Sequence, residues 1–475
     1  MPDLTTLDGG SVSVSEDAVA TLSDALVGDL LTPESPEYDD ARSLWNAMID
    51  RRPGLIVDCR AEGDVSQAVK FAAEHRIRLS IFGAGHNIAG NAVTDGGLTI
   101  SFRKMNGVDV DPDSRTARVD PGATLGDLDA ATQAHALAVP TGINSTTGIA
   151  GLTLGGGFGW LSRKHGMTVD SLLSARVVLA DGRVVVASES ENSDLFWGLR
   201  GGGGNFGVVT SFEFQLHPVG PEILAGLIVH PFSEAKPILQ AYRDFLEDAP
   251  DELSVWAVLR KAPPLPFLPE DVHGTEILIL AAMYAGDISD GEIALAPLRA
   301  IGNPIADVIG PQSFVDWQQA FDPTLTPGER NYWKTHDFAE MSDAMIDTVI
   351  GYVEMLPDPQ CDVFFAQLGG AQGRVPDDAT AYQGRSTAYL MNVHARWSDA
   401  VLDDSCIEWC RDLWNAMSQY ATGEAYVNFM TEEEGGRLET AYGPSFQRLV
   451  ELKNRYDPTN LFRLNQNIRP KTMTA

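Results

Sequence analysis

The chain has 475 residues, a formal net charge of −32 at pH 7, and a hydrophobic content of 44%. This length accommodates two or three domains of ordinary size, with enough apolar material for their cores. The acidic excess argues against nucleic acid or an anionic membrane surface as a partner, because both attract a positive protein surface.

The N-terminal residues and the cysteines indicate in which cellular compartment the protein is expected. Residues 1–18 contain neither a positive start nor an apolar run, so no signal peptide is expected. No stretch approaches the roughly 20 apolar residues that a transmembrane helix needs. The four cysteines are too few and too scattered for a disulfide framework. Cys406 and Cys410 are expected to be buried thiols on one helix face rather than metal ligands. The chain is thus predicted to be a reduced, cytoplasmic protein without a metal site.

Residues 1–37 are polar and are expected to form a peripheral extension with a short helix within 17–31. From Tyr38 onward, amphipathic helices alternate with short apolar strands, which is typical of an α/β unit. The helices expected in residues 38–220 are 41–50, 62–75, 125–135 and 192–199. The expected strands are 54–58, 78–82, 98–102, a pair within 107–119, 174–178, 183–187 and 208–216.

His217-Pro218 begins a boundary. The next part, 221–424, is expected to be an α/β unit with antiparallel character, and 425–475 to hold a short strand and the helix 444–456. The strands expected in 221–424 are 222–230, 253–259, 276–284, 363–368 and 388–395, with helices 233–247, 342–355 and 398–419.

Residues 202–207 satisfy the spacing G-x-G-x-x-G. A dinucleotide-binding fingerprint requires a strand before this segment and a helix after it. Here the predicted order is reversed, so we reject that interpretation. The sequence also contains no P-loop, no G-x-S-x-G and no H-E-x-x-H, which leaves P-loop NTPases, α/β-hydrolases and zincins without support.

The turn Gly83-Ala84-Gly85-His86-Asn87 follows a predicted strand. Such a turn exposes successive backbone N–H groups and can form a nest for an anion such as a pyrophosphate. Taken alone, His86 would be a surface or core histidine. A second segment, 140–159, has the same mixture of glycine and small hydroxyl residues, with apolar residues that indicate packing. Together the two loops indicate a large anionic cofactor held by backbone groups rather than by Lys or Arg.

These segments occur in the order and spacing of a known family. Between about residues 38 and 470 the chain resembles the FAD-linked oxidoreductases of the vanillyl-alcohol oxidase superfamily, in the branch of berberine bridge enzyme and 6-hydroxy-D-nicotine oxidase. The resemblance rests on the Gly-x-Gly-His turn at 83–86, the Thr-Gly-x-Ala-Gly-Leu-Thr-Leu-Gly-Gly-Gly block at 147–157, residues 199–214, and the ending Tyr-Asp-Pro-Thr-Asn-Leu-Phe at 456–462 with 465–467. Segments 374–382 and 426–430 further resemble bacterial flavoenzymes of enterocin biosynthesis.

The resemblance implies an α+β fold in three parts. A two-subdomain FAD-binding domain of the PCMH type would span 38–220. An α/β substrate domain with an antiparallel sheet would span 221–424. The C-terminal segment, 425–475, would return to the FAD-binding domain, and residues 1–37 would precede it as an N-terminal extension.

The family also implies how FAD is held. Its members bond the histidine of the first turn to the 8α-methyl group of the flavin, which makes His86 the expected covalent anchor. Many members add a second bond from a cysteine, but Asn144 stands at that position, so a single link is expected. The other expected FAD-binding residues are Phe82, Gly83, Ala84, Gly85, Asn87, Gly90, Thr141, Gly142, Thr146, Thr147, Gly151, Thr153, Gly157, Gly207, Val208, Asn465 and Asn467.

The implied activity is that of an oxidase. Thr147 matches a position that faces the flavin where oxygen approaches, and a small residue there fits an oxidase. The substrate would be a small alcohol, sugar, amine or phenolic natural product that loses hydride from a C–H next to O or N, with O2 as acceptor. The alternatives are an oxygenase or cyclase of secondary metabolism, a dehydrogenase with another acceptor, and a flavin-binding protein without turnover. A monomer or homodimer is expected, with no nucleic-acid or membrane partner.

The catalytic base is not evident. Plant relatives carry a base in Tyr-x-Asn-Tyr, whereas this motif ends in Phe429. Other relatives carry a Glu or Tyr on the strand before Gly369-Gly370, where this chain has Phe364 and Ala366. Because Phe364 also replaces an acidic residue of the enterocin-type pocket, that oxygenation is not expected. The polar candidates that stay are Tyr426, Asn428, Gln367, Asn392 and His394.

Overall fold

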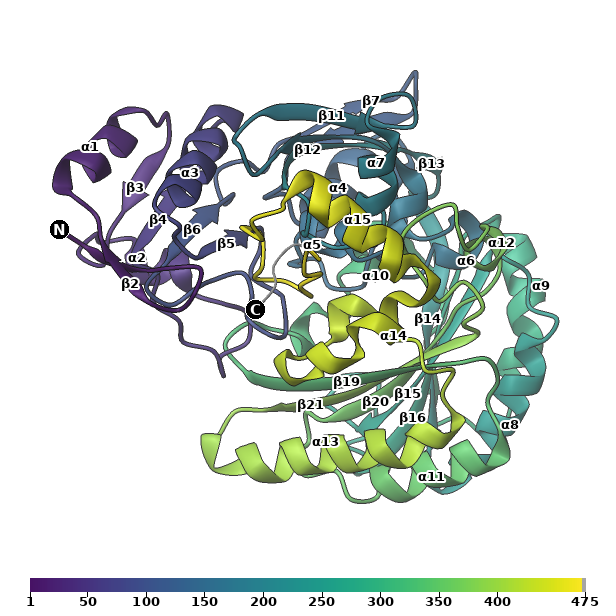
Figure 1. The fold of residues 1–475 in the computed structure, drawn as a ribbon. Coiled ribbons are helices and arrows are strands. Elements are labelled where there is room, and N and C mark those ends of the chain that lie inside the picture. The colour runs from purple at the N-terminus through teal and green to yellow at the C-terminus, as the bar shows by residue number, and fades with distance from the viewer. Residues whose placement is uncertain (472–475) are drawn as a thin grey trace.

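The computed structural model describes residues 1–471, which form three sheets of four or more strands together with their covering helices. The N-terminal half, purple to teal in Figure 1, lies beside a large green sheet, and the yellow C-terminal segment runs between them. This arrangement confirms the α+β fold class expected from the sequence. No helix within residues 1–471 is both long and apolar enough to cross a membrane.

The first subdomain is a four-stranded sheet in the order β3–β4–β6–β5. Strands β4 and β5 both run parallel to β6, while β3 is an antiparallel edge strand. Strands β4 and β6 are buried throughout, as is usual for parallel strands. The polar side chains of β6 are paired inside the subdomain, Thr99 with Ser80 and Ser101 with Asp58. The elements are β1 (Asp3–Thr5), β2 (Ser11–Ser13), α1 (Glu16–Asp24), β3 (Asp29–Leu31), α2 (Tyr38–Arg42), β4 (Leu55–Asp58), α3 (Glu62–Glu74), β5 (Leu79–Phe82) and β6 (Leu98–Ser101).

Residues 1–37 are part of this subdomain, so the expectation of a peripheral extension is wrong. Strand β3 pairs with β4, and the backbone N–H of Arg78, next to β5, donates to the carbonyl of Thr5 in β1. Leu4 and Val14 are buried in the same core as α3. Most polar residues of this segment face solvent, which is why its sequence looks peripheral. Its few buried apolar side chains nevertheless attach it to the core of the subdomain.

The helix expected at 41–50 is also wrong, since α2 ends at Arg42. Beyond it, the Trp45 indole N–H donates to the carbonyl of Leu325 and the Asn46 amide donates to the carbonyl of Asn331. These long-range hydrogen bonds hold the chain outside a helix although its sequence pattern is helical.

The second subdomain is a five-stranded sheet in the order β11–β10–β12–β8–β7, antiparallel throughout. Gly182 has a φ of +78° in the Asp181-Gly182 turn between β10 and β11. Helix α7 precedes residues 202–207 and β12 follows them, which confirms the rejection of the dinucleotide fingerprint. The elements are β7 (Val108–Asp111), β8 (Thr116–Val119), α4 (Leu125–Gln133), β9 (Leu137–Ala138), α5 (Ile149–Leu154), α6 (Ser162–His165), β10 (Leu172–Val178), β11 (Val184–Ser188), α7 (Ser193–Leu199), β12 (Val208–Gln215) and β13 (His217–Pro218).

The third unit is an eight-stranded antiparallel sheet in the order β17–β14–β16–β15–β20–β21–β19, with β18 beside β14. Helices α8, α9, α11 and α13 cover its outer face, and the other face is turned toward the N-terminal half (Figure 1). The elements are β14 (Glu222–Pro231), α8 (Ala235–Leu246), β15 (Leu253–Lys261), β16 (Glu276–Tyr284), α9 (Ile288–Arg299), β17 (Ala306–Asp307), β18 (Gly310–Ser313), α10 (Phe314–Gln318), β19 (Arg330–Phe338), α11 (Asp343–Val353), β20 (Asp362–Gln367), α12 (Ala371–Arg374), β21 (Tyr389–Trp397) and α13 (Asp403–Met417).

Strand β19 and helix α9 were not expected from the sequence. In β19, polar and charged residues occur on both faces, so the run Arg330–Phe338 lacks the alternation that indicates a strand. Its backbone nevertheless pairs with all nine residues of β21. Cys406 and Cys410 lie on α13 as buried free thiols, as expected.

The C-terminal segment forms helical turns, and the short strand expected near 425 is absent from the described chain. Phe429 N–H donates to the carbonyl of Tyr426 and Met430 N–H to that of Val427, which closes 3-10 turns instead of strand pairs. The elements are the 3-10 helices η6 (Val427–Phe429) and η7 (Glu432–Arg437), and the α-helices α14 (Leu438–Tyr442) and α15 (Phe446–Tyr456).

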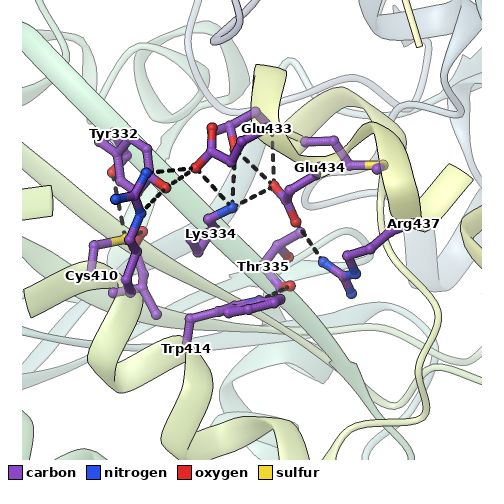
Figure 2. Close-up of polar contacts among 12 residues, drawn as sticks. Tyr332, Lys334, Thr335, Cys410, Trp414, Glu433, Glu434 and Arg437 are labelled. Atoms are coloured by element: carbon purple, nitrogen blue, oxygen red, sulfur yellow. Dashed lines mark hydrogen bonds and ion pairs between the residues drawn. The ribbon is translucent and has the colours of Figure 1, made fainter. Parts of the chain in front are cut away.

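Two buried lysines attach this segment to the two halves of the molecule. Lys453 Nζ donates at 2.8 Å to Asp457 and to the carbonyls of Asn205 and Phe462, on the side of the second subdomain. Lys334 of β19 points between Glu433 and Glu434 of η7, with its Nζ 3.2 Å from each carboxylate (Figure 2). The segment is therefore tied to both halves by charges that burial makes costly to separate.

Candidate functional site

A cavity lies between the glycine-rich loops of the N-terminal half and the inner face of the large sheet. Both predicted loops contribute to its wall, as do residues 203–209, strands β15, β19, β20 and β21, and the segment 426–429. Within residues 1–471 no Asp, Glu, Lys or Arg is among the lining residues. In a chain with a net charge of −32, this makes the cavity an uncharged interior.

The turn after β5 presents a row of free backbone donors. Among the described residues, none accepts a hydrogen bond from the backbone N–H groups of residues 83–87. Gly85 has a φ of +74°, and a Cβ there would lie 2.9 Å from the ring of Phe82. The turn is thus held tightly from behind while its amides stay available, which is the arrangement of an anion nest.

Two glycines of the cavity wall show that space is left for a large group. A Cβ added at Gly151 or Gly204 would meet no protein atom within 4 Å. By contrast, a Cβ at Gly157 would lie 2.1 Å from Thr168, so that glycine is required by packing. The side chain of Asn465 lines the cavity, and its Oδ1 has no hydrogen-bond partner among the described residues. These features fit FAD, whose phosphates need close backbone approach and whose ring N–H and ribityl hydroxyl groups need acceptors such as Asn465 Oδ1.

His86 lies at the end of this turn with both ring nitrogens beside hydroxyl groups. Its Nε2 is 2.9 Å from Thr146 Oγ1, and its Nδ1 is 3.5 Å from Thr147 Oγ1. The ring stacks on Trp45 with centroids 5.2 Å apart. Desolvation lowers the pKa of His86 to about 4, so the imidazole is neutral at physiological pH.

Asn144 determines which nitrogen of His86 carries the proton. Its Nδ2 donates to the carbonyl of Leu325, and its Oδ1 accepts from the backbone N–H and the hydroxyl of Thr146, at 3.0 and 2.7 Å. Because the Thr146 hydroxyl donates to Asn144, its oxygen accepts from His86 Nε2–H. This assignment leaves a lone pair on Nδ1, and a neutral nitrogen with a lone pair can act as a nucleophile.

The opposite wall of the cavity is aromatic. Trp256 on β15 and Phe364 on β20 stack with centroids 5.7 Å apart and ring planes at 10°. Phe364 lies opposite Asn392 of β21, and Trp333 of β19 lies opposite His394, so all of these side chains project from one face of the sheet. Strand alternation thus explains the expected inward position of Phe364.

Tyr426 lies between the two walls. Its Oη accepts hydrogen bonds from the backbone N–H of Gly157 at 3.1 Å and from Asn428 Nδ2 at 3.0 Å. Burial raises the pKa of Tyr426 to about 12, although both hydrogen bonds act in the opposite direction. The phenol is therefore protonated at neutral pH and can donate its own hydrogen to a bound molecule.

Two further candidates, His394 and Gln367, are engaged by the protein. His394 lines the cavity, but its Nε2 is 3.1 Å from Asn331 Oδ1 and its Nδ1 is 3.5 Å from Asp362. Gln367 does not line the cavity, because it shares the alternation of Phe365 on the opposite face of β20 from Phe364. Its Oε1 accepts from the backbone N–H of Val255 on the neighbouring strand. Neither side chain presents a free basic atom.

The expected FAD-binding residues fall into two groups. The lining group comprises Gly83, Ala84, Gly85, His86, Asn87, Gly142, Thr147, Gly151, Gly207, Val208 and Asn465. The group that does not line the cavity comprises Phe82, Gly90, Thr141, Thr146, Thr153, Gly157 and Asn467. Several of the latter support the wall, as Thr146 does for His86 and as Gly157 does for Tyr426.

Sequence reasoning missed Trp45, Trp256 and Trp333 as cavity residues. Trp256 lies on β15, a strand that was expected, at a position whose side chain points to the inner face of the sheet. The sequence pattern alone does not distinguish such a cavity position from a position in the hydrophobic core. Trp45 and Trp333 lie in segments whose secondary structure was not recognised. No group of three or more metal-ligating side chains occurs in residues 1–471.

Comparison with known proteins agrees with this geometry. A family model described as an FAD binding domain matches residues 53–188, and a model described as berberine and berberine like matches residues 425–469. An FAD-linked oxidoreductase of Dictyostelium discoideum is 30% identical over 453 residues, which cover 94% of this chain and 96% of that protein.

Two solved structures are similar over nearly the whole chain. The 6-hydroxy-D-nicotine oxidase from Arthrobacter nicotinovorans matches with a TM-score of 0.85 at 28% identity, covering 94% of this chain and 98% of that one. The xylooligosaccharide oxidase from Myceliophthora thermophila, in complex with xylobiose, matches with a TM-score of 0.84 at 25% identity, covering 96% and 100%. The resemblance stated from the sequence motifs is confirmed: the chain belongs to the berberine bridge enzyme-like FAD-linked oxidoreductases and is an FAD-dependent oxidoreductase.

Proposed function

We propose that the protein is an FAD-dependent oxidase that holds its cofactor through one covalent bond to His86. The observation that carries this proposal is the state of the His86 ring. It is neutral, its Nε2–H is engaged by Thr146, and its Nδ1 keeps a lone pair at the end of a turn with free amides. A single nucleophilic nitrogen at the edge of an uncharged cavity fits a single covalent attachment.

The residues around His86 fit the rest of the cofactor. The amides of residues 83–87 would bind its pyrophosphate, and the bare backbone at Gly151 and Gly204 leaves room for it. A second covalent bond is not proposed, because Asn144 occupies the position of the second anchor and no cysteine lines the cavity among the described residues.

Bound FAD supplies a two-electron acceptor that takes hydride from the substrate and passes electrons to O2. The chain positions the reaction. The hydroxyl of Tyr426, protonated at neutral pH, can donate to an oxygen or nitrogen next to the reacting C–H of the substrate. Thr147 is small and lines the cavity beside His86, which supports access of O2. The buried aromatic wall excludes water from the reacting atoms.

The proposal is tested on the purified protein under anaerobic conditions. Bleaching of the yellow colour by an alcohol, sugar, amine or phenol, followed by rapid return of colour and H2O2 release when O2 is admitted, is the expected result. Bleaching without return in O2, but with return on adding a quinone, would identify a dehydrogenase instead. Incorporation of labelled oxygen from O2 into the product would identify an oxygenase.

A further inference from the structure

The substrate-facing wall combines aromatic rings with an absence of charge. Trp256, Phe364, Trp333 and Phe429 line the cavity, and no Asp, Glu, Lys or Arg does so within the described chain. The carboxylate of Asp362 projects from the same face of the sheet beside this wall without lining the cavity, and it is shared between His394 at 3.5 Å and Arg260 at 4.0 Å. A charged substrate would therefore lose its hydration without gaining a partner of opposite sign.

A few polar atoms of this wall have no partner in the protein. Asn392 is 2% exposed, and its Oδ1 makes no hydrogen bond to any described residue. The indole N–H groups of Trp256 and Trp333 are likewise without acceptors in that part of the chain. Buried polar groups are normally paired, so unpaired ones in a binding cavity indicate where a ligand makes its hydrogen bonds.

We infer that the substrate is an uncharged aromatic compound bearing a ring hydroxyl, with its ring against the Trp256–Phe364 wall and its hydroxyl hydrogen-bonded to Asn392. This inference rests on the proposed function, whose substrate class it narrows. A hydroxyl both donates and accepts, so it satisfies an amide side chain in either sense. The flat rings of the wall favour stacked or edge contacts with another ring.

Two other substrate classes fit this wall less well. An oligosaccharide carries many hydroxyl groups, and the few unpaired polar atoms of an aromatic wall would leave most of them without partners. Carboxylates and phosphates are also disfavoured at a distance, since the net charge of −32 repels anions from the whole surface.

The test is the affinity of the flavin-loaded enzyme for four matched ligands, measured by anaerobic titration calorimetry. They are 4-ethylphenol, its capped analogue 4-ethylanisole, the 4-ethylbenzoate anion, and xylobiose. We expect 4-ethylphenol to bind most tightly, with the anisole about three- to tenfold weaker through loss of one hydrogen bond. The benzoate anion is expected to be at least about tenfold weaker because its charge is desolvated without a partner. Binding of xylobiose or of the anion as tightly as 4-ethylphenol, or no binding of either neutral aromatic compound, overturns the inference.

Substitutions on β20 and β21 distinguish a loss of ligand contact at the wall from a general loss of stability. Phe364→Leu should weaken 4-ethylphenol about two- to tenfold, the range that one aromatic contact supports. Phe365→Leu is the matched control, because Phe365 is the next residue of β20 and packs in the core on the opposite face. Asn392→Leu should weaken 4-ethylphenol but leave 4-ethylanisole unchanged. Equal effects of Phe364→Leu and Phe365→Leu on affinity would contradict the assignment.

The flavin spectrum of the same preparation separates this inference from the function on which it depends. A yellow protein that is bleached by another compound and regains colour in O2, but prefers xylobiose, sinks only the substrate class. A colourless protein that binds no flavin sinks the proposed function, whichever ligand it prefers.

Discussion

The two walls of the cavity are built in different ways. The wall that is proposed to hold FAD, called the cofactor wall below, is mainly backbone: amides of residues 83–87 without acceptors among the described residues, and glycines such as Gly151 and Gly204 that leave open space. The substrate-facing wall is made of side chains that project from adjacent strands, chiefly Trp256 and Phe364. Backbone N–H groups can bind any phosphate or polar ring edge that comes close enough. A wall of side chains instead fits a ligand of one particular shape.

This difference explains how the family can vary its substrates on one fold. Glycine loops cannot be changed without filling the cofactor space, but an inward strand position can exchange one side chain for another. The relatives' names illustrate the result, since one solved structure is a nicotine-type oxidase and another acts on an oligosaccharide.

The largest effect is expected from His86→Ala, which removes the only proposed anchor. Flavin should then be lost entirely from the acid-precipitated polypeptide, although part of it can stay bound before denaturation through the backbone wall. The measurement is absorbance of the washed precipitate. Asn144→Leu is the companion variant, because it removes the acceptor of the Thr146 hydroxyl that orients the His86 ring. Covalent attachment of flavin should then be slower, although His86 is still present.

A bulky side chain on the backbone wall should reduce flavin loading without harming the fold. In Gly204→Val the new side chain enters space that no protein atom fills, so it competes with the cofactor alone. We expect flavin content to fall about tenfold or more, because packed sites tolerate no overlap of this size. Gly351→Val on α11 also meets open space but lies outside the cavity, and it should load flavin normally.

Substitutions at the two buried lysines should affect the two walls of the cavity differently. Lys453→Met removes the only charged partner that Asp457 has among the described residues. Lys334→Met leaves Arg437 as the one remaining cation beside Glu434 in that part of the chain (Figure 2). Each loss should lower the free energy of unfolding by about 3–5 kcal/mol. Flavin loading should suffer more in Lys453→Met, and ligand affinity more in Lys334→Met.

Urea unfolding, flavin content and calorimetric affinity together check this pair. The exposed ion pair of Lys236 with Asp347 supplies the control, since Lys236→Met should change stability by about 1 kcal/mol or less. Identical losses of flavin and of ligand affinity in both buried variants would show that the C-terminal segment does not act on the two walls separately.

The smallest effect concerns Asp129 on α4, behind the cofactor wall. Burial raises the pKa of Asp129 to about 7, against 3.8 in the unfolded chain. Between pH 4 and 7 the unfolded state releases this proton first, so the contribution of Asp129 to stability is lost as pH rises through that window. In Asp129→Asn this loss should be absent, so the variant should gain stability over the wild type between pH 5 and pH 8 in urea unfolding. Parallel pH profiles for both proteins would contradict the assignment.

The cofactor wall could be predicted from the sequence because its chemistry needs glycine and small residues in a fixed local order. The turn at 83–87 and the block at 147–157 are each continuous in the chain, and both line the cavity. The Rossmann spacing at 202–207 could be rejected for the same reason, since its flanking elements are local as well.

The substrate wall could not be predicted because it arises from strand register. Trp333 is brought opposite His394 by pairing of β19 with β21, about sixty residues apart in the chain, and β19 itself has no clear alternation. Trp45 reaches His86 only because long-range hydrogen bonds hold residues 43–54 outside a helix. Such contacts depend on tertiary structure, which local pattern does not encode.

The central claim is one covalent FAD on His86, and mass spectrometry of the denatured wild-type protein tests it most directly. We expect the intact mass to exceed that of the polypeptide by one FAD. After trypsin digestion, that added mass should lie on the peptide 79–103, which contains His86 and no cysteine. An unmodified polypeptide, FAD that links two different peptides, or FAD on a peptide other than 79–103 would contradict the account.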